Sequence, residues 1–185
     1  MQIEFHKISQ RSYAVKILRE NLPVLEMNPA PGFDELMPHD LCHLIVEQVL
    51  KIENAIFGQL KKNGTAGTFR NAPNENSNSK NDSRQRRKSA QKGKKMVKEN
   101  LEDYQKSERA TYICWQNWLE NSSDEKLKKQ ADEMEANAKS IFGKMSAEEK
   151  SIYTKENLAS VRDRMTELSN KWKNLKPGEF MTINW

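Results

Sequence analysis

The stretch QIEFHKISQRSYAVKIL, residues 2–18, decides the fold class, because apolar and polar side chains alternate in two of its segments. QIEFH (2–6) and SYAVKIL (12–18) are also rich in β-branched and aromatic residues, which favour strands. PVLEM (23–27) is expected to form a short third strand. The sequence therefore predicts an N-terminal hairpin.

A further strand is predicted near the other end of the chain. Pro177 and Gly178 favour a turn, and apolar and polar side chains alternate after it along FMTINW, residues 180–185. A strand in this position would bring both ends of the chain into one small sheet.

Most of the chain between these strands has helical periodicity. A helix from about residue 38 to about 57 would carry apolar side chains over more than half of its circumference, which predicts burial on several sides. Apolar stripes with steps of three and four follow in 97–119, 127–145 and 158–175. Ser146 and Glu149 have the spacing of a capping box. The predicted fold class is α+β, a small antiparallel sheet packed against about four helices.

The composition predicts that part of the chain lies outside the core. Of the 185 residues, 36% are hydrophobic and 31% are charged, which is lean for a fully packed domain. Residues 71–95 contain no aliphatic side chain larger than alanine, so they cannot offset the entropy cost of ordering. We expect a single α+β domain over 1–185, with 71–95 as a basic, disordered insertion.

The net charge of +5 lies in one segment. The net charges are −1 for residues 1–63, +7 for 64–100 and −1 for 101–185, which favours a basic segment over a basic groove. This segment could bind nucleic acid through phosphate contacts, although residues 84–98 offer no aromatic side chain for base stacking. The alternative is a solvated loop. The candidate nucleic-acid-binding residues are Arg84, Arg86, Arg87, Lys88, Lys92, Lys94 and Lys95.

The two cysteines, Cys42 and Cys114, both lie among apolar residues in helical patterns. This setting predicts reduced, buried thiols and no disulfide. The first residues resemble no signal peptide, and no apolar run approaches the roughly 20 residues of a membrane span. We expect a soluble cytoplasmic protein with no membrane partner, whose oligomeric state the sequence leaves open.

MPHDLCHLIVEQ, residues 37–48, contains the candidate site. On a helical wheel His39, Asp40, His43 and Glu47 fall within an arc of about 100°. The pattern H-D-x-x-H differs from the zinc-peptidase pattern H-E-x-x-H by one methylene group. His39 and His43 are therefore candidate ligands of a divalent metal such as zinc, and Asp40 and Glu47 are candidate catalytic bases.

Several interpretations of this pattern stay open. A third metal ligand could be Glu47, or could come from the next helix as Glu102 or Asp103. In a purely structural interpretation, Asp40 complements the helix dipole and Glu47 pairs with Lys51.

Three functional hypotheses follow from these residues. The leading one is a polar pocket at residues 39–47 that binds a small ligand or partner. The alternatives are a metal-dependent hydrolase and a nucleic-acid accessory protein that acts through residues 84–98.

Three stretches, MPHDLCHLIVEQ (37–48), FGQLKKNGTAGTF (57–69) and WKNLKPGEFMTINW (172–185), resemble a family of small uncharacterised bacterial proteins. Its signature is P-H-D-L-x-H-x-x-V-E, followed at the C-terminal end by W…L-x-P-G-E-x-x-T-x-x-W. The resemblance covers both ends of the chain, and Cys42 and the basic insertion over 71–95 depart from it. It implies no reaction, cofactor or partner, but it directs attention to Pro38, His39, Asp40, His43 and Glu47.

Overall fold

In the computed structural model, which describes residues 1–72, 91, 93 and 95–185, five antiparallel strands form one sheet. Their order across the sheet is β4-β3-β2-β1-β5. The strands are β1 (Gln2–Ser9), β2 (Ser12–Leu18), β3 (Leu25–Ala30), β4 (Arg70–Asn71) and β5 (Phe180–Asn184).

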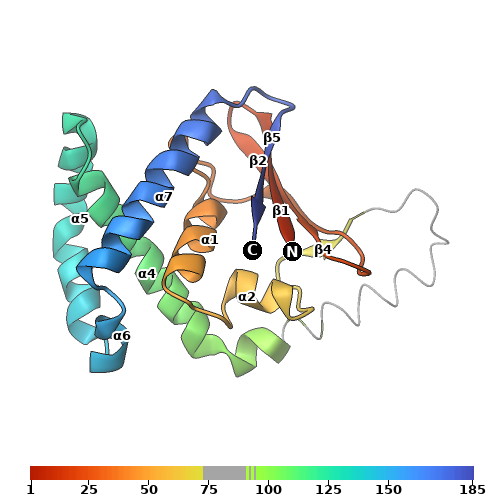
Figure 1. Cartoon of the computed structure of the whole chain (residues 1–185), viewed down its shortest axis with the longest axis horizontal. Helices are drawn as coiled ribbons and strands as arrows, with labels where there is room; N and C mark the ends of the chain where they lie inside the picture. The colour runs from red at the N-terminus through yellow and green to blue at the C-terminus, as the bar shows by residue number, and fades with distance from the viewer. Residues whose placement is uncertain (73–90, 92, 94) are drawn as a thin grey trace.

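The sheet joins the two ends of the chain, as the sequence predicts. Strand β1 lies between β2 and β5, so that Phe5 is opposite Val15 on one side and Met181 on the other. The backbone N–H of Trp185 donates to the carbonyl of Met1 at 2.9 Å, and the two ends lie next to each other in Figure 1.

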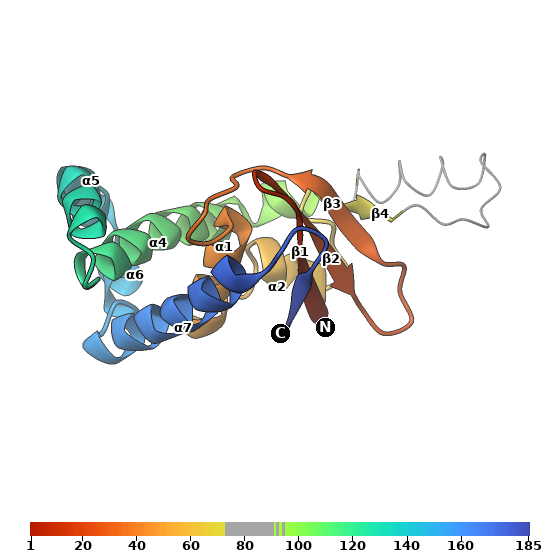
Figure 2. The same ribbon diagram turned by 90° about the horizontal axis from the view of Figure 1, so that it is seen from above.

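The helices lie on one side of the sheet (Figure 2), which confirms the predicted α+β class, a small antiparallel sheet packed against about four helices. Helix α1 packs against α2, α4 and α7, whereas α5 packs on α4 at a distance from the sheet. The helices are α1 (His39–Val49), α2 (Ile56–Lys61), α4 (Leu101–Glu120), α5 (Glu125–Lys144), α6 (Ala147–Ser151) and α7 (Lys155–Asn174).

The hydrophobic core lies between the sheet and helices α1 and α7. Alternate side chains of β1 and β2 point into it, which is the physical reason for their period of two. From the helical side, Leu41 and Ile45 of α1 and Trp172 of α7 are fully buried. Helix α1 is therefore central to the domain, and polar side chains on it must find partners inside the protein.

The predicted helix from about 38 to about 57 is wrong at its C-terminal end. Helix α1 ends at Val49, Lys51 adopts a left-handed backbone (φ 56°), and α2 begins separately at Ile56. The carboxylate of Glu47 accepts hydrogen bonds from the first backbone N–H groups of α2. The first N–H groups of a helix have no acceptor within the helix, and the Glu47 carboxylate serves as that acceptor for α2. The same bonds hold the turn between α1 and α2.

The structure describes only residues near the two limits of the predicted insertion over 71–95. Asn71 pairs with Leu25 in the sheet, and the N–H of Ala72 donates to the carbonyl of Val24 at 2.8 Å. At the other limit, residues 91, 93 and 95–99 are helical. The prediction for residues 73–90, 92 and 94 lies outside the part of the chain that the structure describes.

The capping box predicted at Ser146 and Glu149 forms only in part. The Ser146 hydroxyl accepts from the N–H of Glu149 at 3.0 Å and caps α6. The Glu149 carboxylate does not return to Ser146; it forms a two-pronged ion pair with Arg109 of α4, at 2.7 and 2.8 Å. This acid therefore ties α6 to α4.

Cys42 and Cys114 are both buried and free, as predicted. Within the described part of the chain, the structure contains no helix with the length and apolar character needed to span a membrane.

Candidate metal centre

The loop that precedes α1 fixes the position of His39. Pro38 forms the N-cap of the helix, and the N–H of His39 donates to the carbonyl of Gly32 at 3.0 Å. Gly32 has a φ of +72°, and a Cβ atom at this position would lie 2.7 Å from the Cβ of His39. Glycine is required here because both the backbone conformation and the close approach exclude a side chain.

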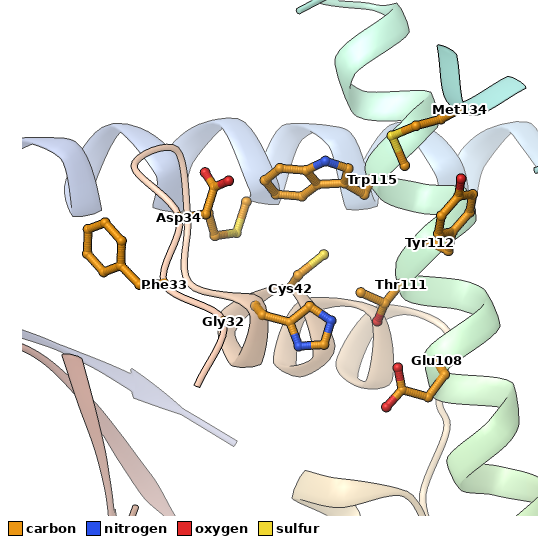
Figure 3. Close-up of a pocket in the computed structure, with 11 residues that line it drawn as sticks. Gly32, Phe33, Asp34, Cys42, Glu108, Thr111, Tyr112, Trp115 and Met134 are labelled. Carbon is orange, nitrogen blue, oxygen red and sulfur yellow. The ribbon is translucent and has the colours of Figure 1, made fainter. Parts of the chain in front are cut away.

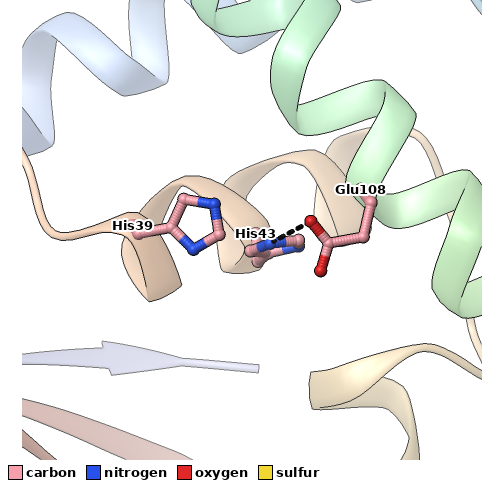
Figure 4. A group of neighbouring side chains, drawn as sticks. All are labelled: His39, His43 and Glu108. Atoms are coloured by element: carbon pink, nitrogen blue, oxygen red, sulfur yellow. Dashed lines mark ion pairs between the residues drawn. The ribbon is translucent and has the colours of Figure 1, made fainter. Parts of the chain in front are cut away.

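His39 and His43 leave α1 on the same side, and Glu108 of α4 points toward them (Figure 4). The two imidazole rings are 4.6 Å apart between centroids. Each of the three side chains offers one potential ligand atom, and these three atoms lie within 4.8 Å of one another. The structure therefore brings the two predicted histidines together with an acid that the sequence analysis does not single out.

A chain of hydrogen bonds orients the ring of His43. Its Nδ1 lies 2.8 Å from Oγ of Ser107, and the Ser107 hydroxyl donates to Oε1 of Glu47 at 2.9 Å. A serine hydroxyl has one hydrogen, and Ser107 uses it in the bond to Glu47. The Ser107 oxygen must therefore accept a hydrogen bond from His43, which places the ring N–H on Nδ1. In the neutral ring this tautomer leaves the lone pair on Nε2, the atom that faces Glu108.

The Nε2 atom of His43 is buried and has no hydrogen-bond partner among the residues that the structure describes. Its nearest acidic atom is Oε2 of Glu108 at 3.6 Å, which is longer than a hydrogen bond. The His43 side chain is only 1% exposed, so leaving this atom unpaired costs free energy. A cation between the lone pairs of Nε2 and Oε2 would satisfy both atoms.

The protonation states of the two other donors suit a metal ion. Surrounding protein atoms displace water from the His39 ring, and this desolvation lowers the pKa of His39. The nearby His43 lowers it further, whereas the charges of Asp40 and Glu108 oppose the shift. When the His43 ring carries a proton on Nε2, it lowers the pKa of the Glu108 carboxyl, although partial burial opposes this effect. A neutral imidazole and an ionised carboxylate are the forms that coordinate metals.

Two imidazoles and one carboxylate form a common ligand set of zinc sites that keep a coordination position open. With bonds of about 2.0–2.2 Å, tetrahedral coordination would bring the donor atoms to roughly 3.3–3.5 Å from one another. His39 and Glu108 are exposed and can move this distance, whereas His43 is fixed by Ser107. The arrangement therefore combines one rigid ligand with two adjustable ones.

The structure places Asp40 outside this cluster. Its carboxylate accepts a hydrogen bond from the Tyr13 hydroxyl on β2, and only 7% of the residue is exposed. Burial raises the pKa of Asp40, while the bond from Tyr13 and the two nearby histidines, His43 and then His39, oppose this rise. Asp40 thus tethers α1 to the sheet and is not among the donor atoms that surround the candidate metal position.

Glu47, the other candidate base, also lies outside the cluster, and the Ser107 hydroxyl lies between it and His43. It is 1% exposed, and burial raises its pKa to about 7 despite the bonds from Ser107 and from the N–H groups of Phe57 and Gly58. Its carboxylate accepts at 2.8 Å from Phe57 and 3.3 Å from Gly58. The predicted pairing of Glu47 with Lys51 is therefore wrong, because this acid faces the interior.

The third donor, Glu108, differs from the candidates Glu102 and Asp103. Asp103 instead accepts from the side-chain amide of Asn54 at 2.8 Å, and Glu102 is exposed. A signal for Glu108 does exist in the sequence, because positions 104, 108, 111 and 115 share one helical face. An acid on the same face as two aromatic residues, Tyr104 and Trp115, marks a polar site on a packed helix.

A cavity of about 350 Å³ opens next to the cluster, and His39 and Glu108 form part of its wall (Figure 3). Trp115, which the apolar stripe predicts to be a core residue, is only partly buried and lines this cavity. A metal ion at the cluster would therefore be accessible to a small molecule from this side.

The structure describes only one of the seven candidate nucleic-acid-binding residues. Lys95 lies in the helical turn 95–99 and pairs with Glu99 at 3.6 Å. The nucleic-acid hypothesis for residues 84–98 stays a prediction. The candidates that lie outside the described residues are Arg84, Arg86, Arg87, Lys88, Lys92 and Lys94.

Comparisons of the chain with protein-family models, with curated proteins and with solved structures find no match. The resemblance to a bacterial family therefore stays a prediction.

Proposed function

We propose that this protein binds a divalent metal ion of the zinc class through His39, His43 and Glu108, and that the ion holds a small molecule in the adjoining cavity. One observation carries the proposal: the buried Nε2 atom of His43 has no hydrogen-bond partner among the described residues and faces the Glu108 carboxylate at 3.6 Å. The orientation of that ring by Ser107 supports it, because metal-binding histidines are commonly held through their second nitrogen.

Metal binding by the untagged protein tests this proposal. After chelator treatment and dialysis, titration with Zn²⁺ should give one ion per chain, and Co²⁺ should give the visible absorption of a site with nitrogen and oxygen ligands. His39→Ala and Glu108→Gln should each weaken binding at least about tenfold, since each removes one of three ligands. Both side chains are exposed, so these changes should leave the fold intact.

Two control variants separate the site from general charge effects. His6→Ala removes a histidine that stacks on Phe180 at the sheet edge, away from the cluster. Glu102→Gln removes an exposed acid from the same helix as Glu108. Neither should change the affinity for Zn²⁺. The absence of stoichiometric binding, or equal losses in the control and site variants, would contradict the proposal.

Metal-dependent hydrolysis is the second candidate function. It is favoured by the ligand set, which would leave a position for a water molecule whose pKa the metal lowers. The two predicted bases are engaged elsewhere, Asp40 with Tyr13 and Glu47 with Ser107, so such a reaction would depend on the ion itself. Zinc-dependent cleavage of p-nitrophenyl acetate that His39→Ala abolishes would support this activity, and cleavage that is independent of zinc would exclude it.

A further inference from the structure

We infer that the ligand of this site is a monocarboxylate with an apolar body, held by its carboxylate on the metal and by its body in the cavity. This inference rests on the proposed metal site and goes beyond it by naming the class of ligand. It is drawn from the charge of the metal cluster and from the walls of the cavity.

The charge of the cluster matches a single negative charge. A divalent ion with two neutral imidazoles and the Glu108 carboxylate carries a net charge of +1. None of the described residues that line the cavity is lysine or arginine, and a second acid, Asp34, lies in its wall. A dianion such as a phosphate monoester would therefore carry one charge for which the described wall has no cation.

The rest of the cavity is suited to an apolar body. Figure 3 shows Trp115 and Met134 at the end opposite Glu108, so an apolar group would extend away from the metal toward these side chains. A volume of about 350 Å³ falls within the range of small-molecule sites. The apolar and aromatic residues of the wall are Phe33, Met37, Tyr112, Trp115 and Met134.

The polar groups of the wall are few, and Glu108 and Thr111 are on the side of the metal cluster, whereas Figure 3 shows Asp34 beside Trp115. Thr111 is 3.2 Å from Nδ1 of His43 and also lines the cavity. Asp34 already accepts from the N–H of Leu36 at 2.7 Å. A monocarboxylate with an apolar body would place its carboxylate on the ion and its body against the apolar side chains of the wall. A sugar or a polyol would instead bury many hydroxyls against apolar side chains, where they would lack hydrogen-bond partners.

Calorimetric titration of the zinc-loaded chain tests the ligand class with four probes: 4-phenylbutyrate, acetate, 4-phenyl-1-butanol and phenyl phosphate. The Kd of 4-phenylbutyrate should be at least about tenfold lower than that of acetate, because its body is buried. It should also be at least about tenfold lower than the Kd of the alcohol, which lacks the anionic head, and of the phosphate, whose second charge is unmatched.

Variants of the wall locate the bound molecule. Trp115→Leu should raise the Kd of 4-phenylbutyrate at least about fivefold, because it removes apolar contact area from the wall. The affinities for acetate and Zn²⁺ should stay unchanged. Trp118→Leu is the matched control, since this neighbouring tryptophan does not line the cavity. Met134→Glu offers a second test through a partly buried side chain, because a new acid in the wall should repel the anion.

The outcomes separate this inference from the metal proposal. Stoichiometric zinc binding with equal affinities for acetate and 4-phenylbutyrate would overturn the ligand class and leave the metal site standing. Binding of 4-phenylbutyrate that is as tight in the zinc-free protein would overturn the role of the ion in holding the ligand. If zinc does not bind at all, both proposals fall together.

Discussion

The Ser107 hydroxyl on α4 lies 2.8 Å from Nδ1 of His43 on α1, so a contact between two packed helices determines which nitrogen of that ring is free. Because Ser107 donates to Glu47, the buried acid acts on the candidate metal position through an intervening hydroxyl.

Ser107→Ala should weaken Zn²⁺ binding by about 10–100-fold, because it removes the group that orients His43 while all three ligands remain. Competition with a chelating dye measures this affinity. Ser160→Ala is the control, since the Ser160 hydroxyl bonds to the carbonyl of Glu156 within α7. Unchanged zinc affinity in Ser107→Ala would show that the hydroxyl does not orient the ligand.

Glu47→Gln should change how stability depends on pH. Burial raises the pKa of Glu47 from 4.5 to about 7, so between these values the folded state binds the proton more tightly than the unfolded state. The contribution of Glu47 to stability is fully present below pH 4.5 and is lost as the pH rises to about 7. The free energy of unfolding of the wild type minus that of Glu47→Gln should fall over this range by on the order of 3 kcal/mol.

Urea denaturation of both zinc-free proteins at several pH values measures this difference, in which the titration of groups common to both proteins cancels. A difference that stays constant from pH 4.5 to 7 would mean that Glu47 titrates in the folded protein as it does in water.

Tyr13→Phe should destabilise the protein by roughly 1–3 kcal/mol. It removes the hydroxyl that donates a hydrogen bond to the buried Asp40 carboxylate, and this carboxylate would then be unsatisfied. The loss should be smaller when Asp40→Asn is already present, and a double-mutant cycle in urea denaturation measures this coupling. Zinc affinity should change little in Tyr13→Phe. Losses that simply add would indicate that the two side chains contribute independently.

Gly32→Ala should reduce both stability and zinc affinity, because the new Cβ atom would lie 2.7 Å from the Cβ of His39. Gly178→Ala is the matched control: its φ of +93° is also left-handed, but nothing lies within 4 Å of the added atom. Backbone strain should cost both variants roughly 1–2 kcal/mol. Only Gly32→Ala should lose zinc affinity, and equal zinc affinities in the two variants would contradict the role of this contact in placing His39.

The sheet could be predicted because its signals are local. The alternation along 2–18 and 180–185 reflects one buried and one exposed face, and the structure pairs these segments as expected. The end of α1 could not be predicted in this way, because apolar periodicity continues past Val49 through Ile52 and Ile56. What ends the helix is a tertiary contact, the capping of α2 by Glu47.

The candidate site could be predicted only in part for a similar reason. Spacing alone places His39 and His43 on one helical face, and the structure brings their rings together. Spacing also places Asp40 and Glu47 near that face, but their carboxylates find partners in the sheet and in α2. Glu108 is 65 positions after His43, and only the packing of α4 on α1 brings the two side chains together.

The position of β1 between β2 and β5 has a consequence for synthesis on the ribosome. The hairpin of β1 and β2 can form once about twenty residues have emerged, but the other edge of β1 pairs with residues 180–184. Until residues 180–184 have been synthesised, that edge has unpaired backbone groups to which another nascent chain could add. Strand β5, which is synthesised long after β1, is thus the strand that shields this edge.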